Sequence, residues 1–250
     1  MGVLGNRVAI VTGGGNGIGE GIALEFAAEG AKVVVVDIDF EGAKRVVARI
    51  EGSGATALAV QADVSNEASV ASMVSTVAER FGGINILANN AGQDPRYVWH
   101  MMSVEQWDHI QAVNLRSCFL CARGVFPYFK KQGSGKIINI SSVTFWRGRP
   151  QNLVHYIASK GGVIGFTRAL ACDVGEFNIQ VNAITPGGVE TEKEKKYATP
   201  EMLAAFVALQ ALPRRVLPKD IARAAVFLAS ADSDVITGQT LNVDAGLAMH

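Results

Sequence analysis

Two residues that could move a proton, Tyr156 and Lys160, stand four positions apart in the segment HYIASKGGVIGF. Residues four apart on a helix lie on one face, so both side chains could reach a common ligand. A free tyrosine has a pKa of about 10, but a nearby ammonium stabilises the phenolate and lowers that pKa. The pair could therefore take a proton from an alcohol and return it to a carbonyl. The same spacing also occurs on ordinary helices, so other motifs must support this interpretation.

A glycine-rich turn near the N-terminus could hold a phosphate group. The segment VAIVTGGGNGIGEGIALEF passes from a strand pattern to a helix pattern through Thr12, Gly13, Gly17 and Gly19. Backbone N–H groups and the helix dipole at such a turn attract the negative charge of a pyrophosphate. The spelling departs from strict G-x-G-x-x-G, and a tight turn alone would also explain the glycines. Asp37 ends the next strand pattern, however, where an acid can bind the adenosine ribose, so the combination predicts dinucleotide binding.

The same acid indicates which dinucleotide is bound. A carboxylate at Asp37 would hydrogen-bond a ribose diol and repel a 2′-phosphate. Neither Asn16 in the loop nor Ile38 after the acid supplies a cation for that phosphate. The sequence therefore predicts NAD rather than NADP.

Short runs rich in Val and Ile alternate with helical patterns along the chain, as in a parallel sheet covered by helices on both faces. The predicted strands are Val8–Thr12, Lys32–Asp37, Thr56–Gln61, Ile84–Asn89, Lys136–Ile140, Gln180–Ile184 and Thr240–Val243. This alternation predicts an α/β fold, a single-domain doubly wound (Rossmann) sheet of about seven strands spanning residues 1–250. Asp39, Ser65 and Ser103 are the expected helix N-caps, the last with Gln106 in a capping box.

One segment interrupts the rhythm of strands and helices. Residues 187–218 contain glycines, a charge run and a short apolar helix pattern from Met202 to Leu212. Because the segment follows the sixth strand, we expect a small lid over the carboxyl edge of the sheet. A solvated surface excursion is the alternative.

Composition excludes several classes of protein. The 250 residues carry 23 Lys plus Arg and 23 Asp plus Glu, so nothing favours nucleic acid or an anionic membrane as a partner. A strand pattern begins almost at once, which leaves no room for a signal peptide, and a cytoplasmic location is expected. Cys118 and Cys121 have C-x-x-C spacing but are interpreted as buried thiols on a helix. No metal is expected, because the histidines are scattered: His100, His109, His155 and His250.

Further motifs occur in order along the chain: Asp63 in QADV, NNAG at 89–92, Asn114 in AVNL, NISS at 139–142, YIASK, and PGGVET at 186–191. With the glycine loop, they make the chain resemble the short-chain dehydrogenase/reductase family over nearly its whole length. The resemblance implies that Tyr156 is the acid–base residue and that Lys160 lowers its pKa and holds the nicotinamide ribose. It also implies that Ser142 binds the substrate oxygen and Asn114 holds a water in a proton relay.

The resemblance implies a set of cofactor contacts as well. Asp63 and Val64 would contact adenine, Asn90, Ala91 and Gly92 would line the cleft, and the Ile184–Thr191 region would border the nicotinamide. The full predicted set is Gly13, Asn16, Gly17, Ile18, Gly19, Asp37, Ile38, Asp63, Val64, Asn90, Ala91, Gly92, Tyr156, Lys160, Pro186, Gly187, Val189 and Thr191.

One spacing departs from the family pattern. The gap from Ser142 to Tyr156 is 14 residues, one longer than usual, and an extra residue in the loop 146–154 would account for it. Ser141 is farther still. His155 adjoins the tyrosine and could reach the pocket rim, while Arg96 and Tyr97 could contact substrate or lie on the loop surface.

The substrate is expected to be a hydrophobic, aromatic or cyclic secondary alcohol or its ketone. The predicted pocket walls are Val143, Thr144, Phe145, Trp146, Pro95, Tyr97, Trp99, Val189, Met202, Leu203 and Phe206. A 3-oxoacyl thioester, a polyol or sugar, and a heteroaromatic alcohol are the alternatives. A non-catalytic dinucleotide sensor would not need the four polar residues, and an extended-type epimerase would need a larger C-terminal domain. The helices expected over 103–131 and 153–174 are apolar on more than one face, which with the family habit predicts a homotetramer.

Overall fold

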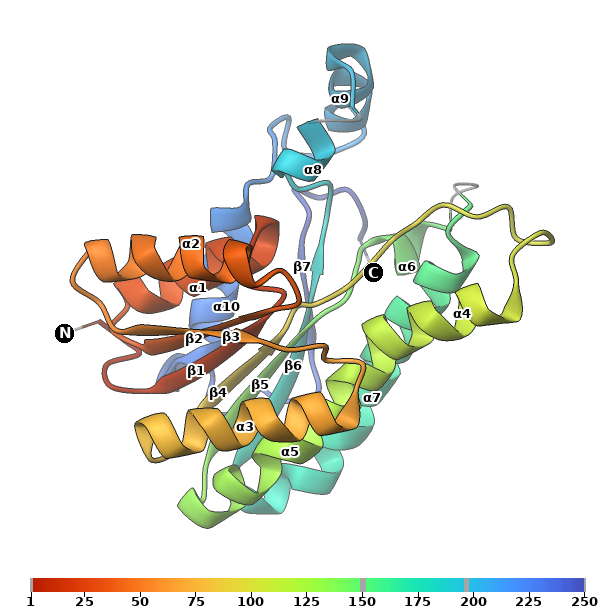
Figure 1. Cartoon of the computed structure of the whole chain (residues 1–250). Helices are drawn as coiled ribbons and strands as arrows, with labels where there is room; N and C mark the ends of the chain where they lie inside the picture. The colour runs from red at the N-terminus through yellow and green to blue at the C-terminus, as the bar shows by residue number, and fades with distance from the viewer. Residues whose placement is uncertain (1, 149–151, 196–197, 250) are drawn as a thin grey trace.

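The computed structural model describes residues 2–148, 152–195 and 198–249 (Figure 1). Within these ranges seven strands form one parallel sheet in the order β3-β2-β1-β4-β5-β6-β7. The strands are β1 (Val8–Thr12), β2 (Lys32–Asp37), β3 (Ala57–Gln61), β4 (Ile86–Asn89), β5 (Gly135–Ile140), β6 (Ile179–Pro186) and β7 (Thr240–Val243). The predicted doubly wound α/β fold is confirmed.

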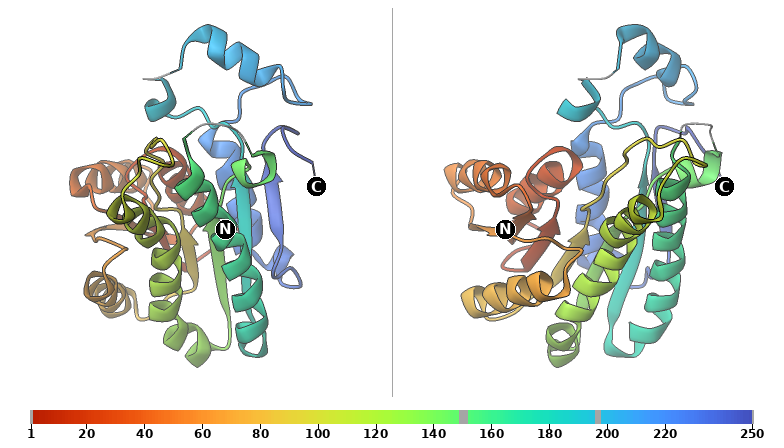
Figure 2. Two further views of the ribbon diagram at one scale, coloured as in Figure 1. Left: turned by 90° about the vertical axis from the view of Figure 1, so that its right-hand side faces the viewer. Right: turned by 45° about the vertical axis from the view of Figure 1, so that its right-hand side comes forward.

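Two layers of helices cover the sheet (Figure 2). The layer on one face consists of α1 (Gly17–Ala28), α2 (Phe40–Gly52) and α10 (Pro218–Ala229). The layer on the other face includes α3 (Glu67–Phe81), α4 (Val104–Gln111), α5 (Ser117–Gln132) and α7 (Val154–Val174).

The pleat of β1 explains why its sequence is apolar throughout. Successive strand side chains point to opposite faces. Accordingly, Ala9 and Val11 belong to the core beneath α1 and α10, while Val8 and Ile10 belong to the core beneath α3 and α5. A strand that is buried on both faces has no position at which a polar residue would meet water.

The order of the strands sets the position of the site. From β1 the chain turns first toward β2 and β3 and later returns to β4 on the other side, so the sheet changes direction between β1 and β4. In open sheets of this kind, ligands bind outside the carboxyl ends of the strands at this switch point. The glycine turn follows β1, and Asn89–Gly92 follows β4.

The helix boundaries agree with the expected caps in two of three places. The Asp39 carboxylate accepts the Gly42 N–H, and Ser103 forms the predicted reciprocal capping box with Gln106. The assignment of Ser65 was wrong. Asn66 caps α3 by accepting the Ser69 N–H, whereas the Ser65 hydroxyl donates to the Asp63 carboxylate. Because Asp63 is an acceptor two residues away, Ser65 binds locally and leaves the cap to the next residue.

The segment after β6 rises above the carboxyl edge of the sheet (Figure 1). It carries α8 (Glu192–Lys195) and α9 (Pro200–Val207). The helix α9 is shorter than the helix pattern predicted from Met202 to Leu212. A parallel bridge between Val189 and Val216 joins its two ends. Residues 196 and 197 of this segment lie outside the described residues.

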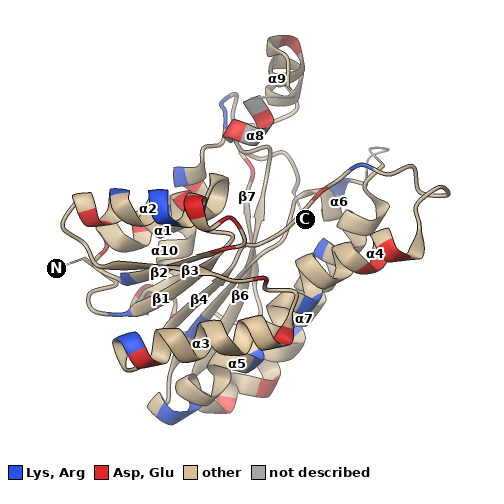
Figure 3. Ribbon diagram, viewed as in Figure 1, with Lys and Arg blue, Asp and Glu red and all other residues tan. Residues whose placement is uncertain are grey.

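Charged residues of both signs are intermingled over the helices in the view of Figure 3. No helix within the described ranges is long and apolar enough to cross a membrane. The described residues also contain no cluster of three His, Cys, Asp or Glu side chains that could hold a metal. His250 lies outside those residues. Cys118 and Cys121 are free, buried thiols on α5, as interpreted from the sequence.

Candidate active site

A cleft of about 1160 Å³ lies between the carboxyl ends of the strands and the segment that carries α8 and α9. Its floor comes from the loops after β1, β4, β5 and β6 and from α7. Predicted site residues on its lining are Ile18, Asn90, Gly92, Ser142, Tyr156, Lys160, Pro186, Gly187, Val189 and Thr191. Five elements far apart in the sequence therefore meet at one place.

The glycines of the first turn stand where other residues would not fit. A Cβ on Gly19 would lie 2.0 Å from the Gly13 carbonyl oxygen, and a Cβ on Gly13 would lie 2.8 Å from the Ala91 Cα. Gly13 and Gly17 also have positive φ angles of 61° and 56°. A close backbone turn of this kind leaves an open cradle at the N-terminus of α1, as a pyrophosphate requires.

Hydrogen bonds tie this turn to the loop after β4. The Thr12 hydroxyl accepts the backbone N–H groups of Asn90 and Ala91, at 3.0 and 3.2 Å. In return, the Asn90 side-chain amide donates to the carbonyls of Thr12 and Gly13, each at 3.0 Å. The two halves of the cradle are therefore fixed against each other. The role of the Thr12 hydroxyl was not predicted, although its position before the glycines was noted.

Asp37 lies beside the glycine turn, as predicted, and its charge is held in place. One carboxylate oxygen accepts the Gly15 N–H at 2.9 Å and the other accepts the Asp39 N–H at 3.0 Å. Ile38 is exposed and supplies no charge. A cation does lie nearby, however. The Arg45 guanidinium on α2 donates to the Gly15 carbonyl at 2.6 Å, although neither of the positions expected to supply a cation, 16 and 38, carries one.

The remaining cofactor candidates divide into two groups. Asp63 and Val64 follow β3 on the Asp37 side, where Asp63 accepts two hydrogen bonds from Ser65 and Val64 is buried. Pro186 to Thr191 lie on the opposite side, above β6. Asn16 is the exposed residue that precedes α1. A dinucleotide stretched across the switch point would reach both groups.

The cleft offers room for a nicotinamide dinucleotide. A Cβ on Gly17 would lie 3.4 Å from the Thr191 side chain, and one on Gly187 would lie 2.9 Å from the Asp244 Cα. A side chain on Gly17 would crowd the gap between the glycine turn and the β6 loop, and one on Gly187 would press on the chain after β7. The pyrophosphate would lie on the glycine turn, the adenosine ribose on Asp37, and the nicotinamide between Lys160 and Thr191.

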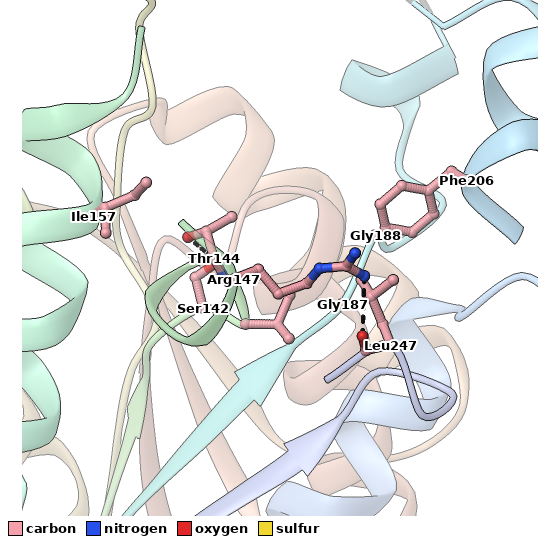
Figure 4. A pocket seen from close by; sticks show the side chains of 9 residues that line it. Ser142, Thr144, Arg147, Ile157, Gly187, Gly188, Phe206 and Leu247 are labelled. Carbon is pink, nitrogen blue, oxygen red and sulfur yellow. Dashed lines mark hydrogen bonds between the residues drawn. The ribbon is translucent and has the colours of Figure 1, made fainter. Parts of the chain in front are cut away.

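Tyr156 and Ser142 face each other at the substrate end of the cleft. The Ser142 hydroxyl oxygen accepts two hydrogen bonds from Thr144, one from its backbone N–H at 3.2 Å and one from its side-chain hydroxyl at 2.9 Å (Figure 4). The Ser142 proton is then free to point at the Tyr156 oxygen, and that hydrogen bond lowers the pKa of the phenol. Burial is the larger effect and raises the pKa of Tyr156 to about 12, with the nearby Asp94 charge acting in the same direction. Thr144 was expected only as a pocket wall.

Lys160 is buried beneath Tyr156. Its ammonium donates to the Ile140 carbonyl at 2.8 Å and lies 5.8 Å from the centre of the tyrosine ring. Burial lowers the pKa of Lys160, while the Cys118 and Asp94 groups raise it. In the protein alone, burial therefore outweighs any lowering by this ammonium, and the pKa of Tyr156 stays raised. The positive charge of an oxidised nicotinamide would stabilise the phenolate and so lower the pKa of Tyr156.

A π-helical segment, Ala112–Arg116, brings Asn114 toward the same point. The Asn114 side chain is fully buried, accepting the Gln93 N–H at 2.8 Å and donating to the Gln93 carbonyl at 2.9 Å. A Cβ on Gly92 would lie 3.3 Å from both Asn114 Oδ1 and Lys160 Nζ. Asn114 thus adjoins the lysine, as a relay requires, and also fixes the loop after Gly92. The contact with Gln93 had no sequence signal.

Several predicted pocket walls lie elsewhere. Tyr97 packs its ring on His155, Trp99 is 66% exposed, and Phe145 lies against Gly161 and Trp146. The aromatic wall was therefore wrong. Proximity in sequence does not fix the direction of a side chain, and Tyr97 and Phe145 pack against other rings outside the cleft while Trp99 faces solvent. The walls that the structure does place in the cleft or its apolar side pocket are Val143, Thr144, Pro95, Val189, Met202, Leu203 and Phe206.

Two kinds of surface remain around the catalytic pair. Phe206, Ile157, Val143 and Leu247 form an apolar side pocket next to Ser142, closed at one end by the Arg147 guanidinium on the Leu247 carbonyl (Figure 4). On the other side, Gln93, Asp94 and Arg96 line the cleft after Gly92. Arg96 therefore contributes to the cleft, whereas Tyr97 does not. His155 is fully buried and does not reach the rim.

The comparisons with known proteins agree with this arrangement. Residues 13–248 match the family described as enoyl-(acyl carrier protein) reductase. The chain belongs to the short-chain dehydrogenase/reductase family, whose members act on the CH–OH group of alcohols or on the corresponding ketones.

Three relatives span almost the whole chain. D-xylose 1-dehydrogenase of Caulobacter vibrioides is 37% identical over 97% of this chain and 95% of its own length. (2S)-[(R)-hydroxy(phenyl)methyl]succinyl-CoA dehydrogenase of Thauera aromatica is 38% identical over 98% and 97% of the two chains. The structure of 3-ketoacyl-(acyl-carrier-protein) reductase from Brucella melitensis with NADH superposes with a TM-score of 0.91, at 39% identity and 98% and 100% coverage. A nicotinamide cofactor is thus typical of the relatives.

Proposed function

We propose that this protein is an NAD(H)-dependent oxidoreductase that interconverts a hydrophobic secondary alcohol and its ketone. The observation that carries the proposal is the grouping of Ser142, Tyr156 and Lys160 at the end of a cleft that fits a dinucleotide. NAD accepts or donates the hydride when bound. Ser142 would hold the substrate oxygen, and Tyr156 would take its proton during oxidation and return it during reduction.

The roles of the supporting residues follow from their contacts. Thr144 donates to the Ser142 oxygen and so leaves the single Ser142 proton for the phenol or, when substrate is bound, for the substrate oxygen. The Lys160 ammonium lies 5.8 Å from the centre of the tyrosine ring and, like Asn114, borders Gly92, so the two side chains could pass a proton from the phenol toward solvent. The fixed charge of Asp37 favours NAD over NADP. Arg45, beside the same loop, weakens that preference without removing it.

A hydrophobic substrate is supported by the side pocket next to Ser142. Its lining of Val143, Ile157, Phe206 and Leu247 offers an apolar body room beside the reacting oxygen. The Thauera relative is named for a succinyl-CoA thioester that carries a hydroxy(phenyl)methyl group, which is a secondary alcohol next to an aromatic ring. An aromatic or cyclic alcohol of modest size is therefore the proposed substrate class.

A sugar or polyol is the second candidate. Gln93, Asp94 and Arg96 give the opposite wall groups that hydrogen-bond hydroxyls. Two relatives are named as a D-xylose dehydrogenase and a probable galactose dehydrogenase. The two walls therefore favour different substrates.

The test is NAD⁺-dependent turnover of a substrate panel. The panel contains 1-phenylethanol-type alcohols, cyclic aliphatic alcohols, aldoses and sugar alcohols, and the reverse reaction with 3-oxoacyl thioesters. The highest kcat/KM is expected for the first two groups, with Tyr156→Phe as the inactive control. A clear preference for aldoses or thioesters would overturn the substrate class, and NADH binding without turnover of any panel member would favour a sensor.

We also propose a cytoplasmic homotetramer. All three cysteines, which lie within the described residues, are free thiols, as is usual in a reducing compartment. Apolar side chains are exposed on Phe119 of α5, Val154 of α7, Phe227 of α10 and Leu241 of β7. Faces of this kind on two sides of the protomer suit two twofold interfaces.

A further inference from the structure

The residue next to the catalytic tyrosine is a fully buried histidine. His155 Nε2 lies 3.0 Å from the carbonyl oxygen of Pro95, in the loop after β4. A carbonyl only accepts, so Nε2 carries the proton and donates. Nδ1 is also buried and has no hydrogen-bond partner among the described residues. The neutral imidazole therefore uses its one N–H to bond the backbone of the loop after β4.

The loop after β4, which receives this hydrogen bond, is held to neighbouring elements at every second residue. Gln93 is held by the Asn114 side chain through both its N–H and its carbonyl. Pro95 is held by His155, and the Tyr97 N–H donates to the Asn152 carbonyl at 3.0 Å.

The histidine makes a second contact with the same loop. The Tyr97 ring also packs on the imidazole, with 5.3 Å between the ring centres. The middle and the far end of the loop are thus both fastened near the start of α7.

The residues between these attachments face the substrate. Asp94 and Arg96 line the cleft together with Tyr156. Asp94 is close enough to influence the pKa of Tyr156, Lys160 and His155. The distance between this polar wall and the catalytic phenol therefore depends on how the loop is held to α7. Because His155 and Tyr156 are consecutive, the histidine couples the two directly.

We propose that His155 is a positioning residue that fixes the Asp94–Arg96 wall relative to the Tyr156 hydroxyl and so determines substrate binding. The inference rests on the proposed function, because the wall matters for the substrate of that same site. His155 does not touch the cofactor or the reacting atoms. Its loss should raise KM for the alcohol and leave the affinity for NADH unchanged.

Two amide substitutions separate positioning from simple filling of space. In His155→Gln the side-chain amide nitrogen can occupy the place of Nε2 and donate to Pro95. In His155→Asn the nitrogen lies near the place of Nδ1, one bond too short for that carbonyl. We expect His155→Asn to raise KM about five- to tenfold, the range for one lost hydrogen bond, with kcat changed less than about threefold. His155→Gln should stay within about twofold of wild type in both constants.

The closing experiment measures KM, kcat and the Kd for NADH in all three proteins, together with hydrogen–deuterium exchange of the 93–101 peptide in the NADH complex. Faster exchange and raised KM in His155→Asn alone are expected. Unchanged KM and exchange in His155→Asn, or equal losses in both variants, would overturn the proposal. If His155→Asn does not fold, Tyr97→Leu removes the ring contact instead, and unchanged exchange there would also refute it. Absence of wild-type turnover would contradict the proposed function, while the exchange measurement would still decide the role of His155.

Discussion

Replacing Asp37 with serine should relax the exclusion of NADPH. The Asp37 side chain is only 9% exposed, and both carboxylate oxygens accept backbone N–H groups. The charge therefore cannot turn away from a 2′-phosphate. Two like unit charges about 5 Å apart, at an effective dielectric constant of about 20, repel by roughly 3 kcal/mol. That energy corresponds to a factor of about a hundred in an equilibrium constant.

Arg45 reduces this factor. Its guanidinium donates to the Gly15 carbonyl at 2.6 Å, and the Gly15 N–H donates to Asp37 at 2.9 Å, so the two charges lie on either side of one glycine residue. The Arg45 side chain is 57% exposed, so solvent weakens its influence. We therefore expect wild-type kcat/KM to favour NADH over NADPH by more than tenfold. Asp37→Ser should move the ratio toward NADPH by at least tenfold, and adding Ile38→Arg should move it further.

The assay measures kcat/KM for both cofactors at a saturating ketone concentration, with Kd values from fluorescence titration. In the double variant Asp37→Ser/Arg45→Ala, the kcat/KM ratio should shift toward NADPH by less than in Asp37→Ser alone. Glu41→Ser is the matched control, because it removes an exposed carboxylate from α2 that pairs with Lys44 and leaves the glycine turn alone. Equal wild-type efficiencies with NADH and NADPH, or no shift in Asp37→Ser, would refute the reasoning.

Four further outcomes are expected. Tyr156→Phe should remove more than nine-tenths of kcat while leaving the Kd for NADH nearly unchanged, and a smaller loss would contradict its role; Lys160→Ala should impair both. Burial raises the pKa of Tyr156, and alcohol oxidation needs the phenolate. Oxidation should therefore accelerate as pH rises from 7 to 10, whereas ketone reduction should not. An oxidation rate that does not change with pH, when hydride transfer is shown to limit that rate, would contradict this prediction. Thr144→Val should lower kcat about three- to tenfold by freeing the Ser142 hydroxyl, and unchanged kcat would remove Thr144 from the mechanism. Light scattering at micromolar concentration should give the mass of a tetramer, and a stable monomer would exclude the proposed assembly.

The sheet could be predicted closely because its strands are buried on both faces. Val33–Val36 have no exposed surface, and such a run leaves few alternative readings. The largest errors were at β6, which runs from Ile179 to Pro186 rather than from Gln180 to Ile184, and at β4, which begins at Ile86 rather than Ile84. The Asn85 side chain, rather than a backbone carbonyl, accepts the Val8 N–H. The apolar sequence pattern therefore begins before the regular backbone hydrogen bonds between β1 and β4. Local side-chain bonds of this kind leave no periodic signal.

The site was predictable where it depends on backbone geometry and not where it depends on loop side chains. Gly13 and Gly19 stand where steric contact excludes a Cβ, so their spacing alone located the cradle. The aromatic residues Tyr97, Trp99 and Phe145 were assigned to the pocket from proximity in sequence, which does not fix the direction of a loop side chain. Arg45 reaches the cradle from the second turn of α2, far from the two positions at which a cation was sought.

The identity of the serine shows which kind of sequence reasoning is stronger. The gap of 14 residues to Tyr156 is one longer than the family's usual spacing, yet the sequence favoured Ser142 over the more distant Ser141, and part of the loop that carries the extra residue lies at 149–151, outside the described residues. The end of β5 decides between them. Ser141 continues the strand, since its N–H donates to the Ile184 carbonyl at 2.8 Å, and its hydroxyl donates to the Lys160 carbonyl at 2.8 Å. Both serines border the cleft, but the Ser141 proton is bound to a backbone carbonyl, whereas the Ser142 hydroxyl accepts from Thr144 and keeps its own proton for the phenol or a ligand, whatever the length of the loop beyond it.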